Sequence, residues 1–245
     1  MRGIEAGPRL VGIERRAFLG RTLSLGALTL LTGCDVSDGD TVQRALHAMS
    51  DWNDRVQEAL FGRARLAPTF GENDWEKKEF RYNAFFPKDK SPKVDVGSYK
   101  LELAGMIGNK KPWRYDELLA MPQESQITRH VCVEGWSMIG KWTGTPLRIF
   151  LERVDADLKA KYVGFVCADG YYESIDMATA LHPQTIMAFG YGNGKLGKQY
   201  GFPFKMRIPT KLGFKGPKWV TAMYVTNHFP GGFWSDRGYN WFSGS

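Results

Sequence analysis

The sequence is poor in cysteine and histidine, the residues that most often bind metals or form covalent links. Three cysteines, Cys34, Cys132 and Cys167, are spread over 245 residues, which also contain four histidines. Three cysteines are too few for a disulfide framework. Because no two of them form a Cys-x-x-Cys pair, the chain has no redox dithiol, no c-type haem attachment motif and no cysteine-rich zinc site.

Dense runs of charge are also missing. The chain has 33 basic and 26 acidic residues, which gives a formal net charge of +7, but its Lys and Arg residues are dispersed. We therefore expect no nucleic-acid partner. Apolar residues make up 43% and charged residues 24%, values that exclude a wholly disordered chain, a collagen and a coiled coil.

An apolar, small-residue stretch near the N-terminus, residues 22–33, is too short and too mild to span a bilayer of about 30 Å. It follows Arg15-Arg16 and Phe18-Leu19. A charged region, then an apolar region, then a small-residue site is the layout of an export signal. The arginine pair resembles a twin-arginine signal; an ordinary export signal with chance arginines is the alternative.

The end of this stretch, Leu31-Thr32-Gly33-Cys34, resembles a bacterial lipoprotein cleavage box. The resemblance implies that residues 1–33 are removed and that Cys34 is lipidated, with Asp35 favouring retention at the inner membrane. Two or more acyl chains give stable anchoring. The protein is then expected in the periplasm, anchored to the inner membrane. A small-residue cleavage site with an incidental cysteine is the alternative.

After the signal, the sequence predicts two parts. Residues 34–61 combine a polar tether with an amphipathic helix over 41–61, because apolar residues recur there at helical spacing. Residues 62–245 predict one α+β domain with mixed sheets, short helices and long irregular loops. Its strands are expected at 99–104, 161–167, 206–209 and 219–225, its helices at 114–121, 146–154 and 177–181, and a glycine-rich loop at 190–201.

The most informative stretch is residues 129–147, in which Cys132 lies between two valines and is followed by Gly135-Trp136. A thiolate needs a positive partner or a metal near neutral pH. A single cysteine can still be the one protein ligand of a metal whose other ligands come from a cofactor. A buried, inert cysteine is the alternative that chemistry alone leaves open.

This stretch resembles the molybdenum-binding segment of the sulfite oxidase superfamily. Its Cys-Val-Glu-x-Trp-Ser-Met run, residues 132–138, is especially similar to the periplasmic methionine-sulfoxide-reducing molybdoenzymes. Two further blocks match in family order, residues 80–87 and residues 201–220, so that the resemblance covers roughly residues 79–225. It implies a sulfite-oxidase-type fold and a cofactor of molybdopterin with molybdenum, with Cys132 as the protein ligand of the metal.

The resemblance also implies roles for individual residues. Tyr171 is expected to approach the metal, with a packed aromatic as the alternative. Lys205 stands where the family usually has Arg, and Tyr200 where it usually has His or Asn. His130 is either a group that tunes the thiolate or a structural histidine. The expected cofactor-binding residues are Asn83, Cys132, Lys205, Lys215, Gly216, Pro217 and Lys218; a solvated hairpin is the alternative for Lys215 and Lys218.

The direction of the reaction is expected from one substitution. Sulfite-oxidising members of the superfamily place an anion-binding arginine directly before the asparagine, where this chain has Tyr82. Arg81 points to the opposite face of an extended segment and cannot simply replace it. The sequence therefore favours reduction of a neutral S- or N-oxide such as a sulfoxide, with electrons from a separate membrane haem protein or cytochrome. A sulfite dehydrogenase and a non-catalytic lipoprotein of the same fold are the alternatives.

Overall fold

The computed structural model describes residues 40–62 and 65–245. The predicted signal with Arg15 and Arg16, the lipobox with Cys34 and the start of the tether lie outside the described residues. The chain divides into two units, Met1–Asp51 and Trp52–Ser245. All the described strands lie in the second unit, and this unit carries the functional site.

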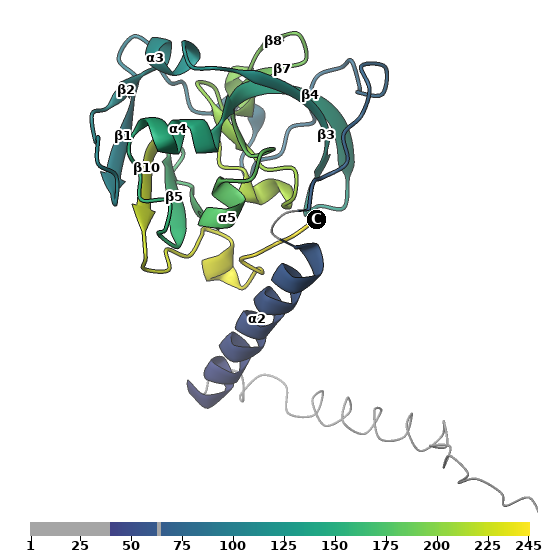
Figure 1. Cartoon of the computed structure of the whole chain (residues 1–245). Helices are drawn as coiled ribbons and strands as arrows, with labels where there is room; N and C mark the ends of the chain where they lie inside the picture. Colours follow the sequence, from purple (N-terminus) through teal and green to yellow (C-terminus); the bar gives the residue numbers. More distant parts are fainter. Residues whose placement is uncertain (1–39, 63–64) are drawn as a thin grey trace, which may run out of the picture. The chain divides into compact units, whose positions relative to one another are not determined.

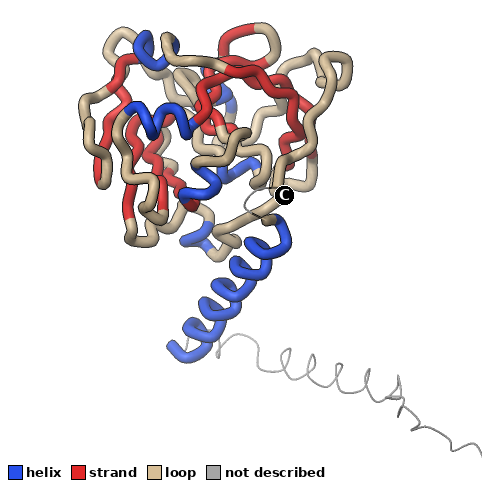
Figure 2. The backbone as a smooth tube through the Cα atoms, viewed as in Figure 1, coloured by secondary structure: helices blue, strands red, loops and turns tan. Residues whose placement is uncertain are grey.

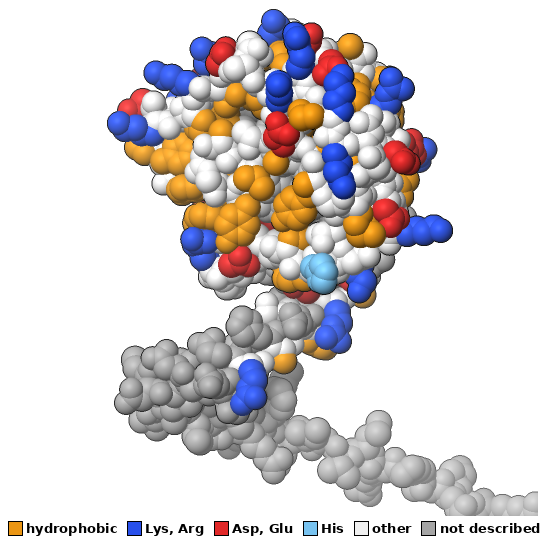
Figure 3. Space-filling model, turned by 90° about the vertical axis from the view of Figure 1, so that its left-hand side faces the viewer, with side chains coloured by type: hydrophobic (Ala, Val, Ile, Leu, Met, Phe, Trp, Pro, Cys, Tyr) orange, Lys and Arg blue, Asp and Glu red, His pale blue; other side chains and the backbone are white. Residues whose placement is uncertain are grey.

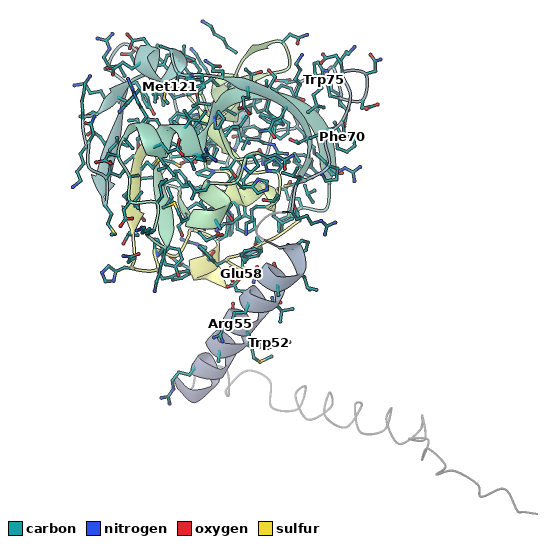
Figure 4. The ribbon with its side chains drawn as sticks, in the orientation of Figure 1. Trp52, Arg55, Glu58, Phe70, Trp75 and Met121 are labelled. Atoms are coloured by element: carbon teal, nitrogen blue, oxygen red, sulfur yellow. The ribbon has the colours of Figure 1, made fainter. Side chains whose placement is uncertain are left out.

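Helix α2 spans Asp40–Phe61, in agreement with the helix predicted over 41–61. Its last turns contact the C-terminal segment: Asp54 Oδ1 accepts hydrogen bonds from the backbone N–H of Phe242 at 2.7 Å and from the side chain of Asn240 at 2.5 Å. Trp52 on the same part of the helix is 65% exposed, and Figure 4 shows it projecting from the helix. Hydrogen bonds therefore fix one face of these turns to the domain.

The first sheet contains the strands near both ends of the domain sequence. Its order is β2 (Trp113–Arg114), β1 (Lys100–Gly105), β10 (Val220–Thr226), β5 (Tyr162–Cys167) and β6 (Tyr172–Asp176). Strands β1 and β10 run parallel, and the other neighbours are antiparallel. Leu101, Leu103, Met223 and Val225 alternate with more exposed residues, as expected of a sheet with one face on a core.

The second sheet carries the cysteine motif. It is formed by β3 (Glu124–Val131), β4 (Ser137–Pro146), β7 (Ile186–Tyr191) and β8 (Gly194–Lys195), with β9 (Lys205–Arg207) paired to β7. Strands β3 and β4 form a long hairpin, and Figure 1 shows β4 curving from this hairpin toward α4 (Leu147–Arg153). The expected loop over 190–201 is in part the tight β7–β8 hairpin, which turns at Gly192 with φ of 61°.

Short helices fill the space around the two sheets, as Figure 2 shows. Leu147, Phe150 and Leu151 of α4 are fully buried in the main core. The remaining short helices are α3 (Tyr115–Leu119), α5 (Met177–Ala180), η1 (Lys88–Lys90), η2 (Lys198–Tyr200), η3 (Gly213–Lys215) and η4 (Ser235–Arg237). The expected α+β architecture with mixed sheets and long connections is confirmed.

The basic surplus of the chain is distributed unusually. On the face in Figure 3, Lys and Arg side chains lie singly among acidic and apolar ones. Four other basic residues are instead at most 4% exposed: Lys205, Arg207, Lys211 and Lys215. Because a buried cation is costly unless it is paired, each of the four requires a partner or a ligand.

None of the helices among residues 40–62 and 65–245 is long and apolar enough to cross a bilayer.

Candidate functional site

Cys132 lies in the turn of the β3–β4 hairpin. Its backbone N–H donates to the Trp136 carbonyl at 2.9 Å, and its own carbonyl accepts from the Gly135 N–H at 3.2 Å. Gly135 adopts a φ of 83°, a left-handed conformation that glycine tolerates best. The turn thus holds Cys132 in a defined position, with its side chain 6% exposed and lining a pocket.

This pocket has a volume of about 250 Å³. It is lined by polar groups around Cys132 and by aromatic rings that come from the segment before η1, the residue before β6, η3 itself and the two sides of η4. We call it the thiol pocket, and its lining residues are Asn83, Ala84, Phe85, Cys132, Val133, Glu134, Asp169, Tyr171, Gly213, Phe214, Gly216, Pro217, Lys218, Trp234 and Tyr239. The pocket therefore brings together the segments around residues 83, 132, 171 and 217, which the sequence predicts to form one site.

The environment of Cys132 does not favour a free thiolate. Burial raises the pKa of its thiol, and the nearby Glu134 carboxylate, whose Oε2 lies 3.7 Å from Sγ, adds to the rise. Among the described residues, no group of three or more His, Cys, Asp or Glu could hold a metal ion. A metal bound at Cys132 therefore needs its other ligands from a cofactor, and its charge would hold the thiolate form.

A cluster of cations lies beside the thiol pocket. Lys205 and Arg207 are 1% and 2% exposed, and their charged groups lie 5.0 Å and 5.6 Å from the centroid of the Trp142 ring. Lys218 pairs with Lys205 through an isolated β-bridge. Burial is the main cause that lowers the pKa of Lys205, and the charges of Lys218 and Arg207 lower it further. Such a cluster favours a ligand with more than one negative charge.

Unbonded polar atoms lie in the same region. His130 Nε2, Arg207 Nε and Asn83 Oδ1 are buried and have no hydrogen-bond partner in the part of the chain that the structure describes. Burial, followed by the charges of the three neighbouring cations, lowers the pKa of His130 well below its usual range. Buried polar groups are normally satisfied, so these atoms indicate that a polar ligand completes the site.

Two glycines let the chain pass close to other residues of the site. A Cβ at Gly213 would lie 2.4 Å from the His130 ring, and a Cβ at Gly216 would lie 2.6 Å from the Met206 carbonyl oxygen. Both glycines line the thiol pocket and also the small recess that contains His130, Lys205 and Arg207. The site is therefore elongated, with a soft metal ligand at one part and buried cations at another. This arrangement fits a molybdopterin, which carries a metal-binding dithiolene and a dianionic phosphate.

Most of the predicted cofactor residues line the thiol pocket. These are Asn83, Cys132, Gly216, Pro217 and Lys218, whereas Lys205 lines the adjoining recess. The Lys218 ammonium group donates to the Asn83 carbonyl and thereby ties two predicted cofactor segments together. Their contacts with the cofactor stay predictions that this geometry supports.

Tyr171 and Lys215 meet a buried carboxylate. The Tyr171 hydroxyl lies 2.8 Å from the Phe214 carbonyl oxygen and 3.2 Å from Glu173 Oε2. The Lys215 ammonium group donates to Glu173 Oε1 at 2.6 Å and to the Ser174 carbonyl at 2.7 Å. Tyr171 lines the thiol pocket, but Lys215 does not. Phosphate binding by Lys215 and an approach of Tyr171 to the metal stay predictions, and the ion pair gives Lys215 a separate structural partner.

The sequence does not predict Arg207 as a member of the cluster, and it predicts His130 either as a group that tunes the thiolate or as a structural histidine. Arg207 Nη2 donates to the Arg129 carbonyl at 2.7 Å and to Thr128 Oγ1 at 3.1 Å, which anchors β9 to β3. The signal for Arg207 was the spacing of two from Lys205, since residues i and i+2 of a strand share one face.

Comparisons with known proteins agree with this site. The family model described as "Oxidoreductase molybdopterin binding domain" matches residues 88–234. YedZ1 of Azospira oryzae, which bears the name of a protein-methionine-sulfoxide reductase subunit, is 54% identical over 231 residues that cover 94% of this chain and 88% of the relative. MsrP of Ralstonia nicotianae, named as a protein-methionine-sulfoxide reductase catalytic subunit, is 32% identical over 178 residues, or 63% of this chain and 54% of the relative.

A solved structure shares the fold. The sulfane dehydrogenase SoxCD from Paracoccus pantotrophus superposes with a TM-score of 0.53 and 17% identity, covering 56% of this chain and 40% of that chain. At this identity the likeness concerns the fold alone.

The family match spans more than half of the chain, and it includes residues 129–147 around Cys132. The chain therefore belongs to the oxidoreductase family that has a molybdopterin-binding domain. It is a molybdenum-dependent oxidoreductase with a sulfite-oxidase-type α+β fold, and its cofactor is molybdopterin with molybdenum.

Proposed function

We propose that this protein is the catalytic subunit of an exported enzyme that reduces sulfoxides, with an oxidised methionine side chain of a polypeptide as the substrate. The observation that carries the proposal is the composition of the thiol pocket, which combines Cys132 with an exposed aromatic wall and two carboxylates. The names of the two relatives point to the same substrate class.

The aromatic wall consists of Phe85, Phe214, Trp234 and Tyr239. Trp234 contacts Tyr239 at 5.3 Å and Phe85 at 6.4 Å between ring centroids, and Phe214 contacts Tyr239 at 6.2 Å. Phe85 is 53% and Tyr239 44% exposed. Aromatic rings bind thioether and methyl groups favourably, and exposed rings can also contact the apolar residues beside a methionine in an extended chain.

The charges of the pocket disfavour an anionic substrate such as sulfite. Glu134 and Asp169 line the pocket, and Lys218, which is the one basic residue among the described lining residues, belongs to the cation cluster. Because a desolvated anion without a cationic partner costs several kcal/mol, these two carboxylates favour a neutral oxide.

The contacts of Tyr82 and Arg81 also disfavour an anionic substrate. The Tyr82 hydroxyl lies 3.2 Å from Ser91 Oγ, and its ring is 5.6 Å from the Lys218 ammonium group. Arg81 instead places its guanidinium 4.9 Å from the Trp136 ring centroid. Neither Arg81 nor Tyr82 lines the thiol pocket, so Arg81 does not supply the missing charge.

The cofactor and the residues around it have separate roles. When bound, the cofactor supplies the two-electron, oxygen-accepting chemistry. Cys132 holds the metal, while Lys205, Arg207 and Lys218 hold the phosphate end through charge-assisted contacts. Reduction of a sulfoxide to a thioether and water consumes two electrons and two protons. The chain has no haem attachment motif, so the electrons come from a separate membrane haem protein or cytochrome.

Export and anchoring complete the proposal. Residues 1–33 act as a twin-arginine signal with a lipobox, residues 34–61 as a tether and helix, and residues 62–245 as the catalytic domain, in the periplasm and attached to the inner membrane through Cys34. Replacing Arg15-Arg16 by Lys-Lys should leave the protein in the cytoplasm. Cys34→Ala should release it from the membrane or block its processing; mature protein that is soluble despite an intact Cys34 would contradict the anchor.

The decisive experiment compares two substrates on one preparation of metal-replete enzyme. A peptide that contains methionine sulfoxide should be reduced with a reduced artificial donor, whereas sulfite should be oxidised poorly, as measured by kcat/KM. Tyr82→Arg should raise the sulfite value relative to the sulfoxide value. Efficient sulfite oxidation without sulfoxide reduction would favour a sulfite dehydrogenase, and folded protein without molybdenum would favour a non-catalytic role.

A further inference from the structure

A second cavity lies on the other side of β3 from the cation cluster. Its volume is about 510 Å³, within the range of about 300–1,000 Å³ typical of small-molecule sites. Along β3, His130 is buried and Arg129 exposed. Because side chains alternate along a strand, Arg129 and Val131 line this second cavity, whereas His130 lines the recess of the cofactor site.

The walls of the second cavity are mainly apolar. Phe61, Leu66, Phe70, Val131 and Phe242 contribute rings and aliphatic groups. Phe70 comes from the segment that bridges to β3 at Thr69, and Figure 4 shows its position beside that strand. A ligand for this cavity therefore has a substantial apolar body.

The polar lining is positive. The basic side chains in the wall are Arg65, Arg129 and Lys211, with His182 beside them, and no Asp or Glu is among the lining residues. Arg65 and Arg129 are exposed, whereas Lys211 is 4% exposed. An anionic group that enters the cavity thus meets cations at its rim and at its base.

Lys211 is the residue that most clearly requires a ligand. Its ammonium nitrogen is buried, has no hydrogen-bond partner among residues 40–62 and 65–245, and lies 2.9 Å from the centroid of the Phe242 ring. Its nearest carboxylate, Asp176, is 3.9 Å away, and both oxygens of that carboxylate already accept hydrogen bonds from Thr179, at 2.6 Å and 2.8 Å. In the part of the chain that the structure describes, no oxygen or nitrogen atom therefore accepts a hydrogen bond from this ammonium group, whose contacts are the Phe242 ring and the long ion pair with Asp176.

We propose that this second cavity binds a monocarboxylate with an apolar chain, its carboxylate on Lys211 and its chain along the aromatic walls. The site is separate from the thiol pocket, with which it shares no lining residue. Nothing in the proposed sulfoxide reduction uses it. A bound carboxylate would accept hydrogen bonds from Lys211, and its chain would cover the rings of Phe61 and Phe242 in the cavity wall.

The affinity should depend on pH. Burial is the main cause that lowers the pKa of Lys211 to about 7, so its ammonium form is lost as the pH rises through neutrality, and carboxylate binding should weaken. The charged or titratable groups that face Lys211 from the packed elements and the cavity wall are Asp54 and Glu58 of α2, Asp176, Lys215, His182, Arg65 and Arg129.

The test uses octanoate on the metal-replete protein, with binding measured by calorimetry at pH 6.5. Octanoate should bind, octan-1-ol should bind at least about tenfold more weakly, and Lys211→Met should weaken octanoate binding roughly ten- to a hundredfold, as expected for a lost charge-assisted contact. Lys159→Met, at an exposed lysine, is the control that should leave binding unchanged.

Three results would overturn the proposal. The first is an absence of octanoate binding. The second is equal binding of octanoate and octan-1-ol by the unaltered protein, a comparison that does not depend on the folding of any variant. The third is competitive inhibition of sulfoxide reduction by octanoate, which would place it in the thiol pocket. Octanoate binding is measured independently of turnover, so failure of the proposed sulfoxide reduction would leave this test intact.

Discussion

The two lysines on either side of Gly216-Pro217 should respond differently when their charge is removed. Lys215 and Glu173 are each 1% exposed and joined at 2.6 Å. Lys215→Met would leave the Glu173 carboxylate buried with the Tyr171 hydroxyl and one backbone N–H as its hydrogen-bond donors. Breaking a buried ion pair in this way costs about 3–5 kcal/mol of unfolding free energy. Lys218→Met removes a buried cation that has no carboxylate in hydrogen-bond contact among the described residues and loses one hydrogen bond, to the Asn83 carbonyl. The cofactor-free protein should therefore lose only about 1 kcal/mol of stability.

The unfolding free energy of Lys215→Met should also depend on pH. Burial raises the pKa of Glu173, and Lys215 is the largest influence that lowers it. In Lys215→Met the folded pKa of Glu173 rises further above the unfolded value. The folded protein then holds a proton that the unfolded chain releases, so the unfolding free energy of the variant should fall as the pH rises from 5 to 8.

The assay is urea unfolding of cofactor-free protein, together with the molybdenum content of protein purified from the same cells. Lys215→Met should be destabilised, and the double variant Lys215→Met/Glu173→Gln should recover part of the loss. Lys218→Met should be stable but poor in molybdenum. If Lys215→Met is as stable as the unaltered protein yet loses its molybdenum, Lys215 is a phosphate ligand, and the reasoning from the ion pair is wrong.

Three further predictions concern the cofactor site. Cys132→Ser should abolish turnover while part of the pterin stays bound, because serine is a poor donor for a soft metal site; full turnover would remove Cys132 from the centre. Gly213→Ala should lower cofactor content, since its Cβ would lie 2.4 Å from the His130 ring, and normal molybdenum content would contradict the close approach. Burial lowers the pKa of Lys218 in the folded protein to about 8. Above that pH the unfolded chain binds more protons than the folded one, so the cofactor-free protein should gain about 2 kcal/mol of unfolding free energy from pH 8 to 9.5. Chemical unfolding should show no such gain when the phosphate is bound.

Local patterns predicted the elements that have strong local signals. The helix ending at Phe61, helix α4 and strands β1, β5 and β10 follow from apolar periodicity, and the structure places them within two residues of the expected bounds. Strand β3 escaped prediction because its sequence is mostly polar and its burial is irregular. Its hairpin partner β4 gains its position from pairing with β3 and β7, which no local pattern reveals.

In the candidate site, too, some residues follow from a local motif and others only from the assembled fold. Cys132 and the segment around Gly216 were predicted because a motif carries them. The Lys215–Glu173 pair joins residues 42 positions apart, and Arg207 is buried on β9 with its guanidinium 5.6 Å from the Trp142 ring centroid. Both are properties of the assembled fold, so the sequence could name Lys215 as a candidate but could not show its partner.

The buried charges link the cofactor to folding. Burial is the main cause that lowers the pKa of Lys205, and the charges of Lys218 and Arg207 lower it further, so the three cations also repel one another in the protein without its ligand. A dianionic phosphate reverses the sign of this interaction, and a ligand that binds only the folded state stabilises it in proportion to its affinity and concentration. The protein should therefore reach its full stability only after it has bound the cofactor. Twin-arginine export, as proposed for residues 1–33, accepts folded proteins that acquire cofactors in the cytoplasm. The cation cluster supplies a physical reason for that order, because cofactor binding before export would complete the fold that the pathway transports.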